Sequence, residues 1–330
     1  MNDRAAVAQF LVEKIFECRI LVIGDIMLDR YFYASVQRIS PEAPVPIAKV
    51  ERQNETLGGA ANVAHNLARL GCQVELLGMA GEDENRQTLI KLLEAQAIGH
   101  RGIVVTNRPT TTKLRVIGGH QQMLRLDFED AGPVAANNLR KLKTVFDEQL
   151  GQVQAVIISD YAKGICTNEF CQYIIKQCLN KAISVIIDPK GVNWRKYRGA
   201  NFITPNLKEL NEVAALRKTV INEDLPVKTA AELVRKRYGL GNVVVTRSEK
   251  GFSLINHETA VHVPTHAREV FDVSGAGDTF IAVLGAAVGA GLEATDAARL
   301  ANLAAGVVVG RAGTYAISRE ELLNAYETVE

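Results

Sequence analysis

The sequence predicts an α/β protein with three layers, in which a mostly parallel β-sheet is covered by helices on both faces. The first observation is that short runs of valine, isoleucine and leucine alternate with longer segments of helical, 3.6-residue spacing. The second is that the short runs are apolar at nearly every position, as in strands buried on both faces. The third is size, because 330 residues that are 47% hydrophobic and 23% charged can form a large core.

The elements follow one another along the chain as strand and helix in turn. The predicted strands of the main sheet are Arg19–Gly24, Val74–Gly78, Val153–Ser159, Ser184–Ile187, Phe202–Thr204 and Val243–Thr246. The predicted helices between them are Ala60–Leu70, Glu84–Ala97, Val134–Leu150, Asn168–Asn180 and Lys228–Tyr238. We find neither an interdomain linker nor an internal repeat, so we expect a single domain over residues 1–330.

Two stretches interrupt the alternation. Residues 31–51 are aromatic, then proline-rich and then β-like, whereas Thr111–Ile117 and Met123–Phe128 alternate polar and apolar residues as a hairpin does. Because proline is confined to edge strands and turns, residues 31–51 cannot form a central strand of the main sheet. We expect both stretches to form a small β-lid over about residues 30–55 and 110–129. Two unrelated surface excursions are the alternative.

Composition excludes several classes of function. Lys and Arg number 38 and Asp and Glu 37, so the net charge of +1 argues against a nucleic-acid binder. The longest uncharged apolar run, Phe280–Leu292, is too short to span a membrane, and Met1–Phe16 lacks the apolar block of an export signal. The five cysteines form no C-x-x-C pair, as is typical of reduced, buried thiols. We therefore expect a cytoplasmic protein without nucleic-acid or membrane partners.

The segment Asp272–Asp278 has the composition of an anion-binding turn. Glycines at 275 and 277 allow a tight turn that presents the N–H groups of Gly275, Ala276 and Gly277 at the start of a helix. A helix N-terminus stabilises an anion through its dipole and its free N–H donors. Asp278, in the first helical turn, could accept a proton from an attacking hydroxyl. The alternative is a glycine-rich turn followed by an ordinary helix-start carboxylate.

A second small-residue helix follows Gly58 and Gly59 and carries Asn62. The glycines would permit close approach of a ligand, and the Asn62 amide can both donate to and accept from a sugar hydroxyl. Packing of the glycines against the rest of the chain is the alternative. The G-x-G-x-x-G and G-x-x-x-x-G-K-[ST] patterns are absent, which argues against a dinucleotide-dependent dehydrogenase and excludes a P-loop kinase.

Further polar turns follow the predicted strands at the carboxyl edge, where parallel sheets bind ligands. Asn206 and Glu209 lie three residues apart on one helix face, so they could either hold a hydrated Mg²⁺ or cap the helix. The segment Thr246–Gly251 could wrap a nucleotide phosphate. Asp160–Gly164 and Asp188–Gly191 each combine an acid with a lysine. We expect these turns to converge on one cleft.

Together, these motifs resemble those of the ribokinase (phosphofructokinase-B type) sugar kinases over about residues 20–325. Gly58–Asn62 and Asp272–Asp278 match the two signatures of that family, and Asn206-x-x-Glu209 matches its Mg²⁺-linked motif. The resemblance implies a ribokinase-like three-layer sandwich that uses ATP and Mg²⁺. One departure is Ser248, where the family's T-x-G-x-x-G nucleotide turn usually has glycine.

Five other segments are similar to the heptose 7-phosphate kinases of that family. They are Gly24–Tyr31, Arg38–Pro46, Leu124–Glu129, Ser159–Gly164 and Asp188–Gly191. The similarity implies phosphorylation of D-glycero-β-D-manno-heptose 7-phosphate at the anomeric O1, a step toward the ADP-heptose of the lipopolysaccharide inner core. A kinase for another sugar phosphate, such as fructose 6-phosphate, and a non-catalytic sugar-nucleotide sensor are the alternatives.

The resemblance also implies a role for each matching residue. Asp278 becomes the base, and the N–H groups of Gly275, Ala276 and Gly277 stabilise the transferred phosphoryl group. The expected ATP-binding residues are Asn206, Leu207, Lys208, Glu209, Thr246, Arg247, Ser248, Gly251 and Asn302, with Mg²⁺ held through water by Asn206 and Glu209. The expected substrate-binding residues are Asp25, Asp29, Gly58, Gly59, Asn62, Arg115, Arg125, Lys163 and Lys190.

The predicted lid carries two further expectations. A guanidinium fork suits a phosphate, so Arg115 and Arg125 on the facing strands of the hairpin, together with Lys163 and Lys190, are expected to hold the phosphate of the sugar. The alternative is that the arginines only solvate the lid. An apolar strip on the lid is too large to leave in water, and it predicts a homodimer through the lid. Its residues are Tyr31, Phe32, Tyr33, Val45 and Ile47.

Overall fold

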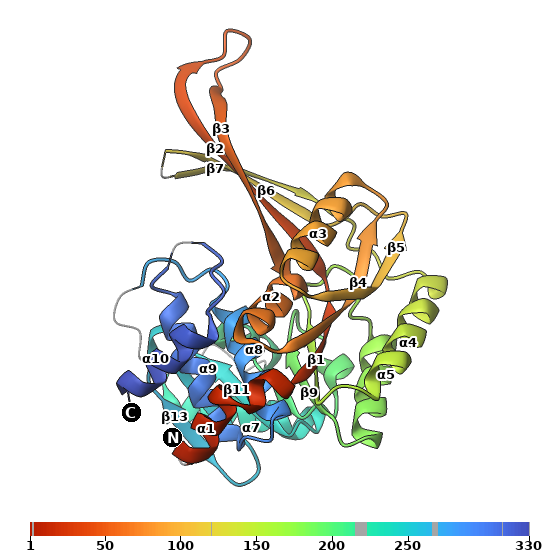
Figure 1. The fold of residues 1–330 in the computed structure, drawn as a ribbon, viewed down its shortest axis with the longest axis vertical. Helices are drawn as coiled ribbons and strands as arrows, with labels where there is room; N and C mark the ends of the chain where they lie inside the picture. The colour runs from red at the N-terminus through yellow and green to blue at the C-terminus, as the bar shows by residue number, and fades with distance from the viewer. Residues whose placement is uncertain (2, 120, 215–222, 266–269, 312, 330) are drawn as a thin grey trace.

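Two β-sheets organise the chain in the computed structural model, which describes residues 1, 3–119, 121–214, 223–265, 270–311 and 313–329 (Figure 1). The main sheet has the strand order β13-β12-β11-β10-β9-β8-β1-β4-β5. Its strands are β1 (Arg19–Gly24), β4 (Gln73–Gly81), β5 (Gly99–Thr106), β8 (Ala155–Ser159), β9 (Ser184–Asp188), β10 (Phe202–Ile203), β11 (Asn242–Thr246), β12 (Phe252–Ile255) and β13 (Ala260–Val263). Neighbouring strands are parallel except in the β11–β12 and β12–β13 pairs, which are antiparallel.

Helices cover both faces of this sheet and bury a separate hydrophobic cluster on each. On β1, Ile20 and Val22 face one cluster, and the intervening Leu21 and Ile23 face the other. The helices on the first face are α1 (Arg4–Val12), α2 (Ala60–Leu70), α3 (Glu84–Ala95), α8 (Ala276–Gly289), α9 (Ala294–Val308) and α10 (Arg319–Val329). Those on the second are α4 (Ala136–Leu150), α5 (Asn168–Asn180), α6 (Leu207–Ala214) and α7 (Asp224–Tyr238). The predicted three-layer α/β fold is thus confirmed.

Small residues let helix α8 lie close to the sheet. A Cβ atom at Gly285 would lie 2.5 Å from Cδ1 of Ile157 on β8, so a side chain at this position would push the helix outward. Helix α8 also packs against α2, which is similarly rich in small residues. This close packing holds the N-termini of both helices near the carboxyl edge of the sheet.

Three strands of the main sheet were not predicted. Strand β5 lies at one edge, and exposed residues interrupt its apolar pattern, so it lacks the continuous run of a central strand. Strands β12 and β13 add antiparallel pairs at the other edge. Helix α7 begins four residues earlier than the expected Lys228, because Pro226 lies in its first turn, where a missing N–H removes no helical hydrogen bond.

The second sheet is the lid, and it extends away from the body (Figure 1). Its strands are β2 (Ile26–Ile39), β3 (Pro46–Gly59), β6 (Thr112–Gly118) and β7 (Gln121–Phe128), in the order β3-β2-β6-β7. The two stretches expected to form it are joined by the parallel β2–β6 pair, and the proline-containing β3 is an edge strand. Strand β2 begins directly after Asp25, so the lid continues into the carboxyl edge of the main sheet.

The lengths of the helices bear on membrane spanning, and the state of the cysteines bears on disulfide bonding. Within the described ranges, no helix is long and apolar enough to cross a membrane. All five cysteines are free and buried. Burial raises the pKa of the Cys18 thiol to about 11 and that of Cys178 to about 12, so both remain protonated and pack as small apolar side chains.

Candidate active site

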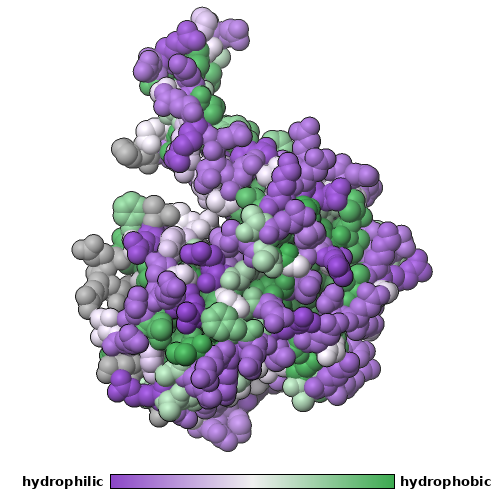
Figure 2. Space-filling view, in the orientation of Figure 1, coloured by the Kyte–Doolittle hydropathy of each residue, from purple (hydrophilic) through white to green (hydrophobic). Residues whose placement is uncertain are grey.

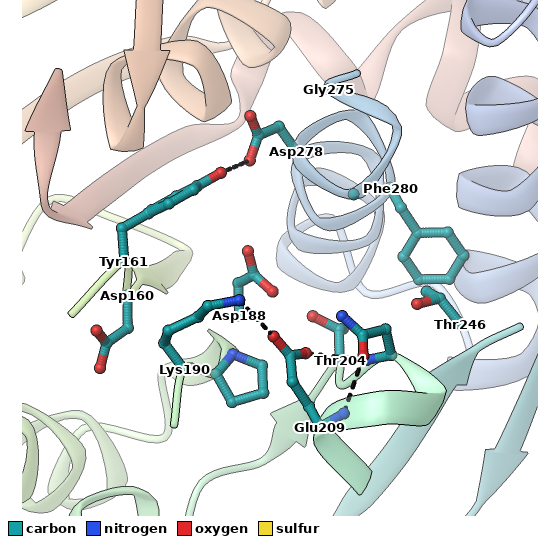
Figure 3. A pocket seen from close by; sticks show the side chains of 13 residues that line it. Asp160, Tyr161, Asp188, Lys190, Thr204, Glu209, Thr246, Gly275, Asp278 and Phe280 are labelled. Atoms are coloured by element: carbon teal, nitrogen blue, oxygen red, sulfur yellow. Dashed lines mark hydrogen bonds and ion pairs between the residues drawn. The ribbon is translucent and has the colours of Figure 1, made fainter. Parts of the chain in front are cut away.

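A pocket of about 200 Å³ lies at the carboxyl edge of the main sheet (Figure 3). Residues at or directly after the carboxyl ends of strands β8, β9, β10 and β11 form its walls, together with the N-terminus of helix α8. Its lining side chains include Asp160, Tyr161, Asp188, Lys190, Glu209, Thr246 and Asp278. The structure therefore brings the polar turns that follow the strands around one cavity.

Asp278 is buried in the first turn of α8, and both of its carboxylate oxygens accept hydrogen bonds. Asn62 Nδ2 donates to Oδ2 at 2.6 Å, and the hydroxyl of Tyr161 donates to Oδ1 at 2.7 Å. Burial raises the pKa of Asp278 to about 6, while these two hydrogen bonds act in the opposite direction. A carboxylate with a pKa near neutrality, held in one orientation, is well suited to act as a general base.

The turn before Asp278 presents backbone donors to the pocket. Gly275 has φ +81°, a left-handed conformation that favours glycine, and α8 begins at the next residue. Within the described part of the chain, the N–H groups of Gly275 and Gly277 have no hydrogen-bond partner, whereas Ala276 N donates to the carbonyl of Val273 at 3.3 Å. A Cβ atom at Gly277 would meet nothing within 4 Å, so this position is open to a ligand.

Gly58 and Gly59 are tightly packed, whereas Asn62 belongs to the site. A Cβ atom at Gly58 would lie 2.3 Å from Oδ2 of Asp29, and one at Gly59 would lie 2.4 Å from the carbonyl of Asp25. The structure thus favours the packing alternative for both glycines. Asn62, in contrast, holds Asp278, and its Oδ1 is buried without a hydrogen-bond partner among the described residues, as an acceptor for a ligand hydroxyl would be.

Asp25 and Asp29 have different surroundings. The Asp25 carboxylate accepts the backbone N–H groups of Tyr161, Lys163 and Ile165 at 2.9, 3.0 and 3.4 Å. The expectation that Asp25 binds a sugar hydroxyl is corrected here, because its oxygens instead hold the loop that carries Tyr161. Asp29 lies at the base of the lid, where its Oδ1 pairs with Nη1 of Arg115 at 2.5 Å.

Asn206 and Glu209 form a reciprocal helix cap, one of the two alternatives for this pair. Glu209 N donates to Asn206 Oδ1 at 2.9 Å, and Asn206 N donates to Glu209 Oε2 at 3.1 Å. The other oxygen, Oε1, accepts Lys190 Nζ at 2.9 Å, and Glu209 still borders the pocket. Lys190, a candidate for holding the phosphate of the sugar, is thus paired with Glu209 and lines the pocket.

Asp188 lines the same pocket and had no expected role. Burial, together with the nearby carboxylates of Asp278 and Glu209, raises its pKa well above the usual range. A pocket that gathers several carboxylates offers the oxygen ligands that a divalent cation prefers. The signal was present in the sequence, since Asp188 is the acid that ends strand β9.

Only part of the predicted nucleotide turn, Thr246–Gly251, lines the pocket. Thr246 lines the pocket. Arg247 does not, because its buried guanidinium donates to Asp224 Oδ1 at 2.5 Å and to Ser253 Oγ at 3.0 Å, which corrects the expected role of this side chain. Ser248 has φ +51°, in the left-handed region, which accounts for the glycine usual at this position of the turn. Gly251 also has a positive φ, +77°.

The remaining expected ATP-binding residues lie outside the pocket lining. Leu207 packs against the hydrophobic cluster of the second face. The Lys208 side chain is 84% exposed and lies 4.0 Å from Glu212, so it points into solvent. Asn302 is buried on α9 and donates to the carbonyl of Pro264 at 2.9 Å, so it holds the segment that follows β13.

Three of the cations expected to hold the phosphate of the sugar, Arg115, Arg125 and Lys163, are already paired with carboxylates. Arg115 and Arg125 face each other across the β6–β7 pair, as the hairpin predicted. Arg125 donates to both oxygens of Asp127, at 2.8 and 2.9 Å, and Lys163 Nζ lies 2.6 Å from Glu129 Oε2. A phosphate would therefore compete with a protein carboxylate for Arg115, for Arg125 and for Lys163.

Two further residues of the site, besides Asp188, received no role from the sequence. The Tyr161 hydroxyl donates to Asp278, and Lys113 Nζ lies over the Tyr161 ring, 5.6 Å from its centroid. Burial and Asp278 raise the pKa of Tyr161 well above its usual range, so the hydroxyl keeps its proton and acts as a donor. Lys113 could have been noticed, because it precedes Arg115 by two residues and so shares its face of the strand.

The pKa of Asp278 predicts how activity depends on pH. In the role of general base that the resemblance implies, Asp278 would work deprotonated, so we expect kcat/KM to fall as pH decreases through about 6. The variant Tyr161→Phe loses a donor to the charged carboxylate, so the pKa rises and the acidic limb of the profile moves to higher pH. A pH–rate profile measures both effects. Tyr173→Phe is the matched control, because the Tyr173 hydroxyl donates to the exposed Asp147. If the pH–rate profiles of Tyr161→Phe and Tyr173→Phe coincide, the prediction is contradicted.

Known proteins share both the sequence and the fold. A model of the pfkB family of carbohydrate kinases matches residues 18–321. The chain is 45% identical over 305 residues to bifunctional protein HldE of Methylobacillus flagellatus, covering 92% of this chain and 62% of the relative. It is 46% identical over 315 residues to bifunctional protein HldE of Stutzerimonas stutzeri, covering 94% and 64%. The chain thus spans less than two thirds of the length of these relatives.

Solved structures show the same fold at lower identity. Phosphofructokinase-2 from Escherichia coli in complex with potassium superimposes with a TM-score of 0.75 at 18% identity, covering 94% of this chain and 98% of that one. Arabidopsis thaliana ribokinase complexed with ribose and ATP gives a TM-score of 0.72 at 19% identity, with the same coverage. These likenesses confirm the ribokinase-like architecture that the motifs implied.

Proposed function

The chain belongs to the pfkB family of carbohydrate kinases, and we propose that it transfers the γ-phosphoryl group of ATP to O1 of D-glycero-β-D-manno-heptose 7-phosphate. The observation that carries the proposal is Asp278, a buried carboxylate that Asn62 and Tyr161 hold beside the backbone N–H groups at the start of helix α8. The similarity of five segments to heptose 7-phosphate kinases supports the choice of sugar. The relatives named HldE support it in the same direction.

In this proposal, Asp278 accepts the proton of the anomeric hydroxyl as O1 attacks the γ-phosphorus and the bond to ADP breaks. The N–H groups of Gly275 and Gly277 and the N-terminal dipole of α8 stabilise the charge on the transferred phosphoryl oxygens. Asn62 and Tyr161 keep the carboxylate in one orientation. The lid would exclude water from the reacting groups.

The pocket also fits a magnesium ion. Asp188 and Glu209 bring carboxylates to one side of the cavity, and a cation bound there would relieve the electrostatic repulsion between them. Mg²⁺ bound with ATP neutralises phosphate charge and is usually held through water by one or two carboxylates. We therefore assign Asp188 and Glu209 to the metal, together with Asn206, and the nucleotide to the wall formed by Thr246 and the turn that follows it.

Removing the charge of Glu209 should raise the Mg²⁺ requirement. Glu209→Gln can still cap helix α6, because glutamine replaces glutamate in a capping box, but it loses its attraction for a cation. We expect the Mg²⁺ concentration at half-maximal rate to increase by about tenfold, the effect of roughly 1.4 kcal/mol. Titration of activity with Mg²⁺ measures this. Glu212→Gln, on the exposed face of the same helix, is the control, and equal requirements in the two variants would argue against the assignment.

ADP release over a panel of sugars tests the choice of substrate. The panel contains D-glycero-D-manno-heptose 7-phosphate, fructose 6-phosphate, ribose and no sugar. Turnover confined to the heptose phosphate is the expected result. Turnover of fructose 6-phosphate instead would keep the mechanism and replace the substrate, and no turnover of any sugar would favour a non-catalytic sensor.

We also propose that the enzyme is a cytoplasmic homodimer that pairs through the lid. Strand β7 presents Leu124, Leu126 and Phe128, which are 42–50% exposed, on one side of the lid, and Figure 2 shows hydrophobic surface interspersed on this projecting sheet. Of the residues first expected in the strip, Val45 is exposed, and the other four are half-buried. Light scattering tests the pairing, and a concentration-independent monomer mass would contradict it.

A further inference from the structure

A cluster of charged side chains lies at the base of the lid. Three of its cations are paired with carboxylates, namely Arg115 with Asp29, Arg125 with Asp127 and Lys163 with Glu129. The fourth cation is Lys113 on β6, which stands opposite Asp29 of β2 and Asp127 of β7 in the strand register. Among the described residues of this cluster, four cations thus lie beside three acids, and Asp278 lies at the far end of the Tyr161 side chain.

Lys113 is the cation of this cluster that forms no ion pair with a described residue. In the part of the chain that the structure describes, no carboxylate lies within ion-pair distance of its Nζ, although Asp29 and Asp127 lie on the neighbouring strands. The side chain is half-buried, and its ammonium lies over the ring of Tyr161. Burial lowers its pKa, as do the nearby cations Lys163, Arg115 and Arg125, whereas the carboxylate of Asp29 acts in the opposite direction. A half-buried ammonium in such surroundings is stabilised when an anionic ligand binds to it.

The position of Lys113 relates this anion to the catalytic base. The Tyr161 ring lies under the ammonium at 5.6 Å, and the hydroxyl of the same ring donates to Asp278 at 2.7 Å. One tyrosine side chain therefore separates Lys113 from the base. A sugar whose reacting hydroxyl lies at Asp278 could extend along this side chain and place a distant substituent at Lys113.

We propose that Lys113 binds the phosphate that the sugar already carries, and that it thereby makes the enzyme select sugar phosphates over free sugars. The inference rests on the proposed function. An ammonium binds phosphate as a point charge with three donors. Arg115, Arg125 and Lys163 would have to leave a carboxylate to do the same, whereas Lys113 would not.

Steady-state kinetics of Lys113→Met tests the proposal. We expect KM for heptose 7-phosphate to rise about ten- to hundredfold, the effect of losing a hydrogen-bonded charge pair, with KM for ATP near that of wild type. The kcat/KM ratio of heptose 7-phosphate to free heptose should fall by the same factor, because free heptose has no phosphate to lose. Lys113→Arg keeps the charge and should restore part of the preference.

The controls separate this role from a structural one. Lys49→Met makes the same change on strand β3, at an exposed position, and should leave both KM values as in wild type. Because Lys113 forms no ion pair within the described ranges, the melting temperature of Lys113→Gln should lie within a few degrees of that of wild type. This variant should also show the same loss of preference as Lys113→Met.

The outcomes distinguish this inference from the proposed function. A Lys113→Met enzyme with the wild-type preference for the phosphorylated sugar would overturn the role of Lys113 and leave the kinase assignment in place. Turnover of fructose 6-phosphate by wild type would replace the heptose, and the same comparison with free fructose would then decide the role of Lys113. A wild-type enzyme that accepts only free sugars would contradict both.

Discussion

Asp278→Asn should lower kcat by about 10²–10⁴-fold, the usual contribution of general acid–base catalysis. Asparagine keeps the size of the side chain and can still accept one of the hydrogen bonds from Asn62 and Tyr161, but it cannot take the proton of the sugar hydroxyl. ATP does not depend on that proton, so its dissociation constant should change little. Fixed-time assays of ADP release measure kcat, and calorimetric titration with ATP measures its dissociation constant.

Asp147→Asn is the control for this variant. Asp147 also accepts a tyrosine hydroxyl, that of Tyr173, but it lies on the exposed side of α4, away from the pocket. It should retain the wild-type kcat. An Asp278→Asn enzyme that turns over within a few-fold of this control would remove Asp278 from the role of base.

Gly275→Val should lower kcat by about 10²–10³-fold, the typical effect of losing one donor to a developing oxyanion. At φ +81° a β-branched residue is strained, and a Cβ atom at this position would lie 3.4 Å from Asn62 Nδ2, which holds Asp278. The turn should therefore relax and move both its N–H groups and the base. Single-turnover measurement of the chemical step, with ATP binding measured alongside, detects this loss.

Gly291→Val separates strain from catalysis. Gly291 has φ +87°, nearly the same conformation, and a Cβ atom there would meet nothing within 4 Å. Both variants should lose similar stability in thermal unfolding, but only Gly275→Val should lose the chemical step. Equal kcat in the two variants would mean that the turn does not present donors to the reacting phosphoryl group.

Much of the fold could be predicted, because a central strand of a parallel sheet has a continuous apolar run. Strands such as β1 and β8 are buried at nearly every position, and their runs are plain in the sequence. The edge strand β5 could not be predicted in this way, since five of its eight residues are exposed or partly exposed and its pattern resembles a loop. The lid could be inferred from proline placement, although the parallel β2–β6 pair that joins its halves could not.

Predictions for the site depended on whether the motif defined the backbone or only the residue type. The glycine turn before Asp278 is set by local conformation, and its left-handed φ and helix start follow from the sequence. The partners of Asp25 and Arg247 are set by tertiary packing. Asp25 is occupied by N–H groups of a loop about 140 positions away, and Arg247 by a carboxylate 23 positions away. Spacing could not reveal either partner.

Phosphorus NMR of the product tests the central claim most directly. Wild-type enzyme is incubated with Mg·ATP and D-glycero-D-manno-heptose 7-phosphate, and the position of the new phosphate is read from its coupling to the sugar protons. The account predicts a single new phosphate on the anomeric carbon, formed in equal amount with ADP and absent with Asp278→Asn. A phosphate on any other carbon, or the same product at the wild-type rate from Asp278→Asn, would contradict it.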